Sequence, residues 1–196
     1  SFERKDNEGV AHFLEHMIFK GSNKLDPGEF DYKIESLGGS SNASTGYDDS
    51  HYYVLIPPEN FEESFLLLTN LVLNPDININ EFELEQNVVI EEIKQQNDQP
   101  EELLYNYFLK RVWKNHFYGK SILGREEYIN QIKVFDLINF HRERYLPDNI
   151  CIALAGNLPD NTLKILENAN FSYKNNLNHQ SKNNHNFNYS IRTGRE

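Results

Sequence analysis

The segment His12-Phe-Leu-Glu-His16 constrains this chain more than any other feature of its sequence. It lies in a largely apolar stretch, residues 10–19, with a glycine before it and another shortly after it, so we expect a helix there. A helix places His12 and His16 on one face, where both imidazoles can bind one metal ion. Glu15 lies on the same side, and it can reach a water at that metal as a general base without being a ligand.

This pattern, H-x-x-E-H, is the reverse of the commoner H-E-x-x-H zinc motif. A catalytic zinc site needs a third protein ligand and an open fourth position. Candidates lie in the acidic segment 82–94, where Glu85 and Glu92 are seven residues apart and therefore share a helix face. Glu91 is rotated by about 100° from Glu92. One residue of this adjacent pair can face inward while the other faces water.

The remaining pattern predicts an α+β fold, with a partly antiparallel sheet covered by helices. Ser40 to Thr45 and Ser50 to Ile56 are two β-compatible runs joined by a turn at Gly46, which indicates a hairpin. Asn149 to Gly156 is continuously apolar and is typical of a buried strand. Capping residues, the spacing of apolar residues and helix-breaking glycines and prolines predict helices over residues 10–19, 26–37, 58–73, 80–96, 101–114, 134–145 and 163–168.

Composition narrows the class of protein. The formal charge of −11 disfavours nucleic acid as a partner, because an acidic chain repels phosphates. No run of about 18 apolar residues exists, so we expect no membrane span. The single cysteine, Cys151, excludes an internal disulfide and a multi-cysteine zinc site, and its apolar neighbours predict burial. Nine of residues 168–188 are Asn, so we expect one domain over 1–167 and an Asn-rich linker over 168–196.

Three motifs occur in order along the chain: Gly9-Val-Ala-His-Phe-Leu-Glu-His-Met-Ile-Phe-Lys-Gly21, then Leu37-Gly-Gly-Ser-Ser-Asn-Ala-Ser-Thr45, then Glu85-Gln-Asn-Val-Val-Ile-Glu-Glu92. Together they resemble the pitrilysin or insulinase family of zinc peptidases, in particular its bacterial and mitochondrial processing-peptidase branch. The resemblance extends from about Gly9 to Gly156.

The resemblance implies a set of site residues. The family's third ligand follows the second His by about 76 residues, with another Glu seven residues earlier, which selects Glu92 as ligand and Glu85 as the acid beside the site. His12, His16 and Glu92 would then bind one Zn²⁺, Glu15 would be the general base, and Glu85 would orient His12 or His16, or modulate the site. We expect no metal role for the histidines outside this motif.

The resemblance also implies a substrate and a partner. Residues 40–45 would be an edge strand that pairs with an extended peptide, and Asn42, Ala43 and Ser44 would contact it. The family's first strands and its second, related domain would be missing from this chain. That domain, fused or separate, would supply an Arg and a Tyr that hold the oxyanion. A cytoplasmic location is only the default expectation.

Two alternatives remain beside a zinc-dependent endopeptidase. Some family members keep the fold but lose zinc ligands and act as non-catalytic, peptide-binding partner subunits. A lyase that cleaves S-ribosylhomocysteine also carries H-x-x-E-H, but its third ligand is a Cys, and here the only candidate is Cys151. The intact motif and the position of Glu92 favour the peptidase.

Overall fold

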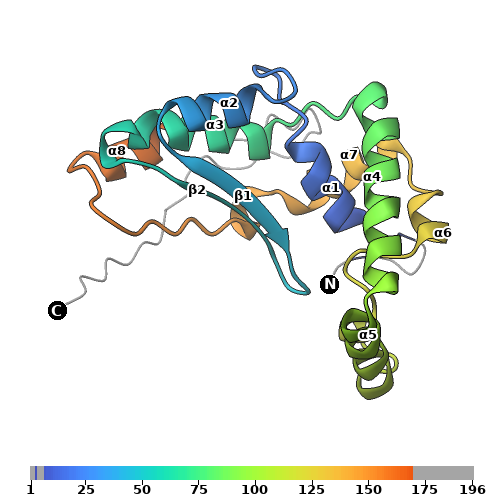
Figure 1. Cartoon of the computed structure of the whole chain (residues 1–196). Helices are drawn as coiled ribbons and strands as arrows, with labels where there is room; N and C mark the ends of the chain where they lie inside the picture. The colour runs from blue at the N-terminus through green and yellow to red at the C-terminus, as the bar shows by residue number, and fades with distance from the viewer. Residues whose placement is uncertain (1–2, 4–6, 170–196) are drawn as a thin grey trace.

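The computed structural model of the chain describes residue 3 and residues 7–169. Helices dominate, and two strands form one antiparallel sheet, which confirms the predicted α+β class (Figure 1). Along the chain the elements are α1 (Val10–Ile18), α2 (Glu29–Ser36), β1 (Ser40–Thr45), β2 (Ser50–Leu55), η1 (Pro58–Asn60), α3 (Phe61–Leu73), α4 (Ile79–Asp98), α5 (Pro100–Val112), η2 (Phe117–Gly119), α6 (Glu126–Ile129), α7 (Val134–Arg144), η3 (Pro147–Asn149) and α8 (Thr162–Asn168).

Helix α1 is the centre of the core. It packs against α4, α7 and β1, and it lies between the hairpin and α4 in Figure 1. Because its apolar residues meet neighbours on several sides, five of its nine residues are buried, namely Val10, Phe13, Leu14, Met17 and Ile18. The same helix therefore carries both the core side chains and the His12–His16 face, so the packing of the core fixes the position of that face.

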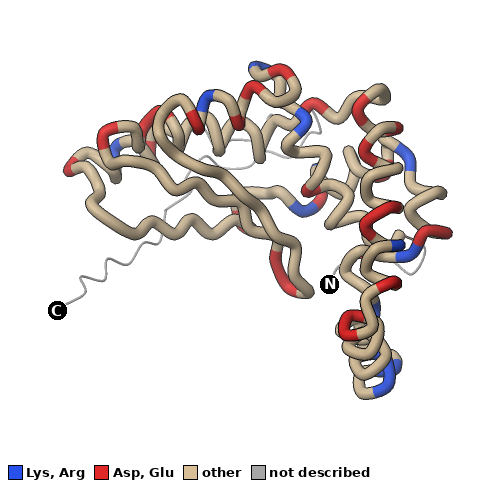
Figure 2. The backbone as a smooth tube through the Cα atoms, viewed as in Figure 1, with Lys and Arg blue, Asp and Glu red and all other residues tan. Residues whose placement is uncertain are grey.

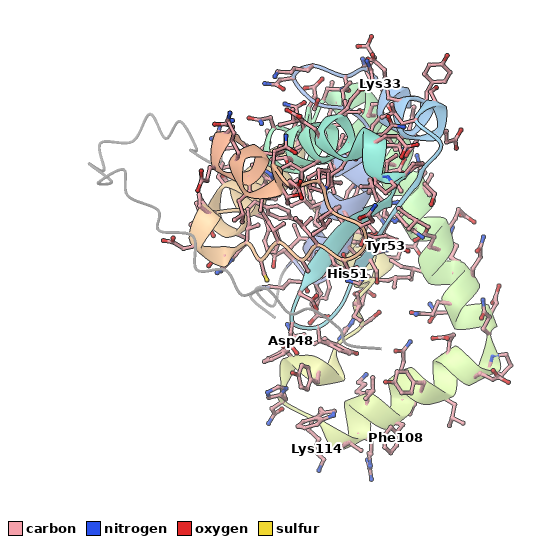
Figure 3. The ribbon with its side chains drawn as sticks, turned by 90° about the vertical axis from the view of Figure 1, so that its left-hand side faces the viewer. Lys33, Asp48, His51, Tyr53, Phe108 and Lys114 are labelled. Carbon is pink, nitrogen blue, oxygen red and sulfur yellow. The ribbon has the colours of Figure 1, made fainter. Side chains whose placement is uncertain are left out.

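The hairpin has the predicted strands. Ser40 pairs with Leu55 and Thr45 pairs with Ser50, and the amide of Gly46 donates a hydrogen bond of 2.7 Å to the carbonyl oxygen of Asp49 across the turn. Alternate residues of each strand face inward, as the twofold period of a strand requires. Figure 3 shows His51 and Tyr53 on the exposed face of β2.

A proline separates α4 from α5. Gln99 precedes Pro100 and takes an extended conformation, with φ −96° and ψ 112°, as residues before proline prefer. The helix that carries Glu92 therefore ends at Asp98, and α5 turns away from it (Figure 1). None of the helices in the described part of the chain is both long and apolar enough to cross a membrane.

Two sequence predictions are corrected. Residues 149–156 were expected to form a buried strand, but residues 150–156 belong to no strand and Cys151 is exposed. A groove of about 790 Å³ is lined by β2 on one side and by residues 149–158 on the other, so the segment does not pair with the hairpin, the one sheet within residues 7–169. The second helix begins at Glu29 rather than at Pro27, because Gly28, with φ 79°, occupies the N-cap position.

The predicted Asn-rich linker, residues 168–196, lies outside the described residues apart from its first two positions. Acidic residues are distributed over most elements of the described chain, α4 among them, as Figure 2 shows. This distribution agrees with the net charge of −11.

Candidate metal centre

Helix α1 presents two imidazoles side by side. His12 and His16 are one turn apart, and their Nε2 atoms lie 3.3 Å from each other. The ring planes are inclined by 68°, and the short distance between the two Nε2 atoms shows that both lie in the same region beside the helix. The predicted stacking of the two histidines on one face is therefore present in the structure.

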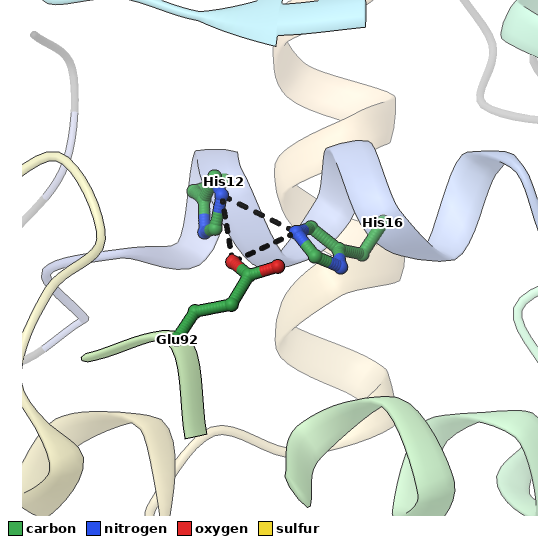
Figure 4. Close-up of side chains that lie close together, drawn as sticks. All are labelled: His12, His16 and Glu92. Carbon is green, nitrogen blue, oxygen red and sulfur yellow. Dashed lines mark hydrogen bonds and ion pairs between the residues drawn. The ribbon is translucent and has the colours of Figure 1, made fainter. Parts of the chain in front are cut away.

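Helix α4 brings a carboxylate to the same point. Glu92 Oε2 lies 3.6 Å from His12 Nε2 and 3.4 Å from His16 Nε2, and Figure 4 shows the three side chains converging. Two ligands of a tetrahedral zinc ion, each bound at about 2.0–2.2 Å, lie roughly 3.3–3.6 Å apart. The separations of these three donor atoms match that geometry, and His12, His16 and Glu92 form the one candidate metal-binding group found among the described residues.

The neighbouring glutamate points elsewhere. Glu91 Oε1 forms an exposed ion pair of 2.7 Å with Lys94 Nζ, one turn further along α4. The rotation of about 100° between adjacent helical residues separates the two carboxylates. Of the two candidates that helical rotation left open, the structure turns Glu92 toward the histidines.

Glu85 contacts His16 rather than His12. Its Oε1 atom lies 2.9 Å from His16 Nδ1, and its side chain is 8% exposed. Because a carboxylate accepts hydrogen bonds, the imidazole Nδ1–H is the donor. This contact leaves the lone pair of Nε2 directed toward His12 and Glu92, which is the tautomer that a metal ligand requires.

The two histidines have opposite electrostatic environments. Burial, followed by the charge of His16, lowers the pKa of His12 from its usual 6.5 to about 4. Burial also acts to lower the pKa of His16, but the hydrogen bond to Glu85 and the charges of Glu92, Glu85 and Glu15 outweigh it and raise that pKa. His12 Nδ1 is buried and has no hydrogen-bond partner among the described residues. A neutral His12 is ready to donate its Nε2 lone pair to a cation.

The pKa of Glu85 is lowered. Burial acts to raise it, but the hydrogen bonds from His16 and Lys20 and the charges of both outweigh burial. Glu85 therefore remains a carboxylate beside His16 and accepts the hydrogen bond from its Nδ1–H.

Glu15 is held by the hairpin. The Thr45 hydroxyl donates a hydrogen bond to Glu15 Oε2, and Thr45 Oγ1 lies 3.2 Å from Ser50 Oγ on the paired strand. Glu15 lies on α1 between the two histidines in sequence and is not one of the three grouped donors. Sequence reasoning placed Thr45 at the end of the substrate strand but missed this contact, because nothing in the local pattern relates residues 15 and 45.

The expected substrate strand has one unpaired edge within residues 7–169, since β1 pairs with β2 alone. The amide of Ala43 donates to Asn42 Oδ1 at 2.8 Å, so this N–H points away from β2. Asn42 and Ser44 are exposed and lie opposite Tyr53 and His51.

The other candidate ligands lie apart from this cluster. His141 is buried on α7 with Nε2 2.8 Å from the carbonyl oxygen of Val72, and His116 packs among aromatic rings next to η2. His51 lies near Asp49, at 3.8 Å, on the exposed face of β2. Cys151 is exposed and does not belong to the grouped donors, so the structure does not favour a lyase-type Cys ligand.

The H-x-x-E-H motif on α1 is the one found in inverzincins, and here a glutamate from a second, packed helix lies beside its two histidines. Comparison with known proteins gives the family. The sequence matches the model of the Insulinase family, Peptidase family M16, over residues 1–126. The chain therefore belongs to this peptidase family.

Individual relatives agree with this assignment. The uncharacterized zinc protease YmxG of Bacillus subtilis is 32% identical over 172 residues, which cover 88% of this chain and 42% of that protein. The beta subunit of the mitochondrial-processing peptidase of Rattus norvegicus is 30% identical over 176 residues, covering 90% of this chain and 36% of that subunit. The crystal structure of a protease from Helicobacter pylori superimposes with a TM-score of 0.85 and 28% identity, covering 92% and 44% of the two chains. This chain thus spans about two fifths of the length of these relatives.

Proposed function

We propose that this chain is the zinc-binding catalytic domain of an endopeptidase that hydrolyses extended or unfolded peptides. The observation that carries the proposal is the group of three donor atoms, His12 Nε2, His16 Nε2 and Glu92 Oε2, separated by 3.3–3.6 Å, with Glu15 on the same helix as the two imidazoles. The relatives named zinc proteases support zinc as the metal. Under this proposal the zinc-peptidase domain comprises residues 1–167.

The donor set fits a catalytic rather than a structural site. His12, His16 and Glu92 would hold the metal, and three protein ligands leave a fourth position open. When bound, zinc supplies a Lewis acid and lowers the pKa of a coordinated water to about 7. Glu15 would accept the proton of the attacking water and then deliver it to the leaving amine. Glu85 would hold His16 in the tautomer that leaves Nε2 free to coordinate.

The peptide would bind along β1. Its unpaired edge offers the backbone N–H of Ala43, and an extended peptide that adds to this edge gains main-chain hydrogen bonds without requiring a particular sequence. Asn42 and Ser44 would contact the peptide with their side chains. Asn42 Oδ1 would release the Ala43 amide when the peptide binds, since both acceptors compete for one donor.

A second M16 domain would complete the enzyme, either fused to this one or as a separate subunit. One relative carries the name of a processing-peptidase subunit, and the chain spans about two fifths of the relatives. The alternative role, a peptide-binding partner subunit without catalysis, is less well supported, because the three ligand atoms and Glu15 are all present.

The decisive experiment removes the base and keeps the ligands. Glu15→Gln in the assembled enzyme should retain stoichiometric zinc and lose hydrolysis of an unstructured quenched peptide by at least about 10²-fold. Chelation should abolish the activity of the unaltered enzyme, and added zinc should restore it. Near-normal turnover by Glu15→Gln would defeat the mechanism, and zinc binding without any hydrolysis by the unaltered assembly would favour the non-catalytic subunit.

A further inference from the structure

Each oxygen of the Glu85 carboxylate has its own nitrogen partner. Oε1 contacts His16 Nδ1 at 2.9 Å, and Oε2 contacts Lys20 Nζ at 2.6 Å. The Glu85 side chain is 8% exposed, whereas Lys20, in the turn that ends α1, is 32% exposed. Lys20 therefore reaches from the surface to a buried carboxylate that touches a metal ligand.

The Glu85 carboxylate depends on both of these contacts. Taking a carboxylate out of water is costly unless it is paired and hydrogen-bonded. Among the ion pairs of the described residues, Lys20 supplies the ammonium contact of Glu85 and His16 supplies the imidazole contact. The Lys20 contact therefore stabilises the buried carboxylate in the position from which it reaches His16.

We propose that Lys20 is a positioning residue of the metal centre. By occupying Oε2 of Glu85 it holds Oε1 against His16 Nδ1, which keeps the His16 Nε2 lone pair directed at the metal. The inference rests on the proposed function, because it takes the His12, His16 and Glu92 group to be a zinc site. Lys20 acts through Glu85 and touches neither the metal nor the peptide.

The alternative is that Lys20 forms an ordinary surface ion pair, which contributes little. The chain contains a matched example of such a pair. Lys94 Nζ lies 2.7 Å from Glu91 Oε1, but both side chains are largely exposed, at 49% and 63%, and neither touches a ligand. The two Lys–Glu pairs have nearly equal lengths and differ in burial and in contact with His16, so Lys94 is the control for Lys20.

The test measures zinc affinity of the full chain by competition with a chromophoric chelator. Lys20→Met keeps the length of the side-chain stem and removes the charge, and it should weaken zinc binding by about tenfold, within the range for groups that orient metal ligands. Lys94→Met should leave the affinity within about twofold of the unaltered chain, and Lys20→Arg should restore most of the loss. In a Glu85→Gln background, Lys20→Met should have no further effect, because the residue through which it acts is altered.

A spectroscopic readout separates positioning from general stability. In the zinc-bound chain, ¹⁵N NMR of the His16 ring should show a protonated Nδ1 that donates a hydrogen bond, and Lys20→Met should shift this signal while Lys94→Met does not. Failure of the unaltered chain to bind zinc would overturn the proposed function itself. Zinc binding by Lys20→Met at the unaltered affinity, or an unshifted His16 signal, would overturn the role of Lys20 alone.

Discussion

At the scale of single residues, the candidate site depends on which atom of each side chain points inward. Glu91 and Glu92 are adjacent and identical in chemistry, yet one contacts Lys94 at the surface and the other approaches two imidazoles. The two histidines are likewise identical in chemistry, but of the two the Glu85 carboxylate contacts His16 and not His12. These differences give each residue a separate, measurable role.

The adjacent glutamates should behave differently when neutralised. Glu92→Gln removes a charged oxygen donor from the three-ligand group and should weaken zinc binding by more than about 10²-fold, beyond the range for groups outside the ligand set. Glu91→Gln should leave affinity unchanged, because its carboxylate lies at the surface with Lys94. Zinc titration of both variants gives the comparison. Loss of zinc binding in Glu91→Gln alone would show that the third ligand is Glu91 and not Glu92.

The two histidines should titrate in different pH ranges in the metal-free chain. The pKa of His12 is lowered to about 4, so protonation favours the unfolded chain, and this histidine lowers stability as pH falls from about 6.5 toward 4. The pKa of His16 is raised, so its protonation stabilises the fold below about 6.5, and that contribution is lost as pH rises through the raised pKa. At a pH above the pKa of His12 and below the raised pKa of His16, zinc binding should therefore release a proton from His16.

NMR titration of both imidazoles, with calorimetry of zinc binding in buffers of different ionisation enthalpy, measures these quantities. A reversed order of the two midpoints would contradict the assignment of Glu85 to His16.

At the scale of elements, the site depends on how α1 is anchored at its start. Gly9, the N-cap of α1, lies against the backbone of Leu123 and Gly124. The buried Glu8 carboxylate pairs with Lys120 Nζ at 3.2 Å and lies 3.6 Å from Arg125 Nε. The 120–125 loop therefore packs against the start of α1, a few residues before His12.

A methyl group at this contact should disturb both stability and the metal site. In Gly124→Ala the new Cβ would lie 2.3 Å from the Glu8 carbonyl oxygen, at φ 80°, and we expect a loss of about 3–5 kcal/mol of unfolding free energy together with weaker zinc binding. Gly28→Ala is the matched control, because Gly28 has φ 79° and nothing within 4 Å of the added atom. It should cost only about 1–2 kcal/mol from backbone strain and leave zinc affinity unchanged.

Urea unfolding and zinc titration of both variants make this comparison. Equal losses of stability in the two variants would show that backbone conformation alone, and not the contact with Glu8, matters at Gly124.

At the scale of the whole molecule, this chain brings together the proposed zinc ligands, the proposed base and one candidate peptide-binding edge. It spans about two fifths of the relatives that it matches. We expect the groups that stabilise the oxyanion, an Arg and a Tyr by the family resemblance, to come from a second M16 domain. Catalysis would then require two domains, whereas zinc binding would require one.

Residues 1–196 alone should bind zinc but cleave an unstructured quenched peptide at a rate at least about 10²–10³ below that of the assembled enzyme, the usual effect of losing one oxyanion donor. Adding the second domain in trans should restore cleavage, with a rate that saturates as that domain is titrated. Cleavage rates with and without the added domain provide the measurement. Full activity of the chain alone would show that the oxyanion is stabilised within these residues.

The local sequence pattern was sufficient to predict many of the helices, the hairpin and the position of the two histidines. The helical spacing of His12 and His16, the hairpin over 40–55 and the helix that carries Glu85 and Glu92 follow from periods of 3.6 and 2 residues and from nearby glycines and prolines, all of which act within a few residues of the chain. The family resemblance then selected Glu92 over Glu91 as the third ligand, and the structure has the same residue beside the histidines.

Tertiary structure decided the features that depend on distant partners. The contact of Glu85 with His16, the bridge from Lys20 to Glu85 and the hydrogen bond from Thr45 to Glu15 join different elements, and no local period encodes them. The same reason explains the incorrect prediction for residues 149–156. An apolar run has the composition of a buried strand, but a strand forms only where a neighbouring backbone completes its hydrogen bonds, and here a groove lies between this segment and β2.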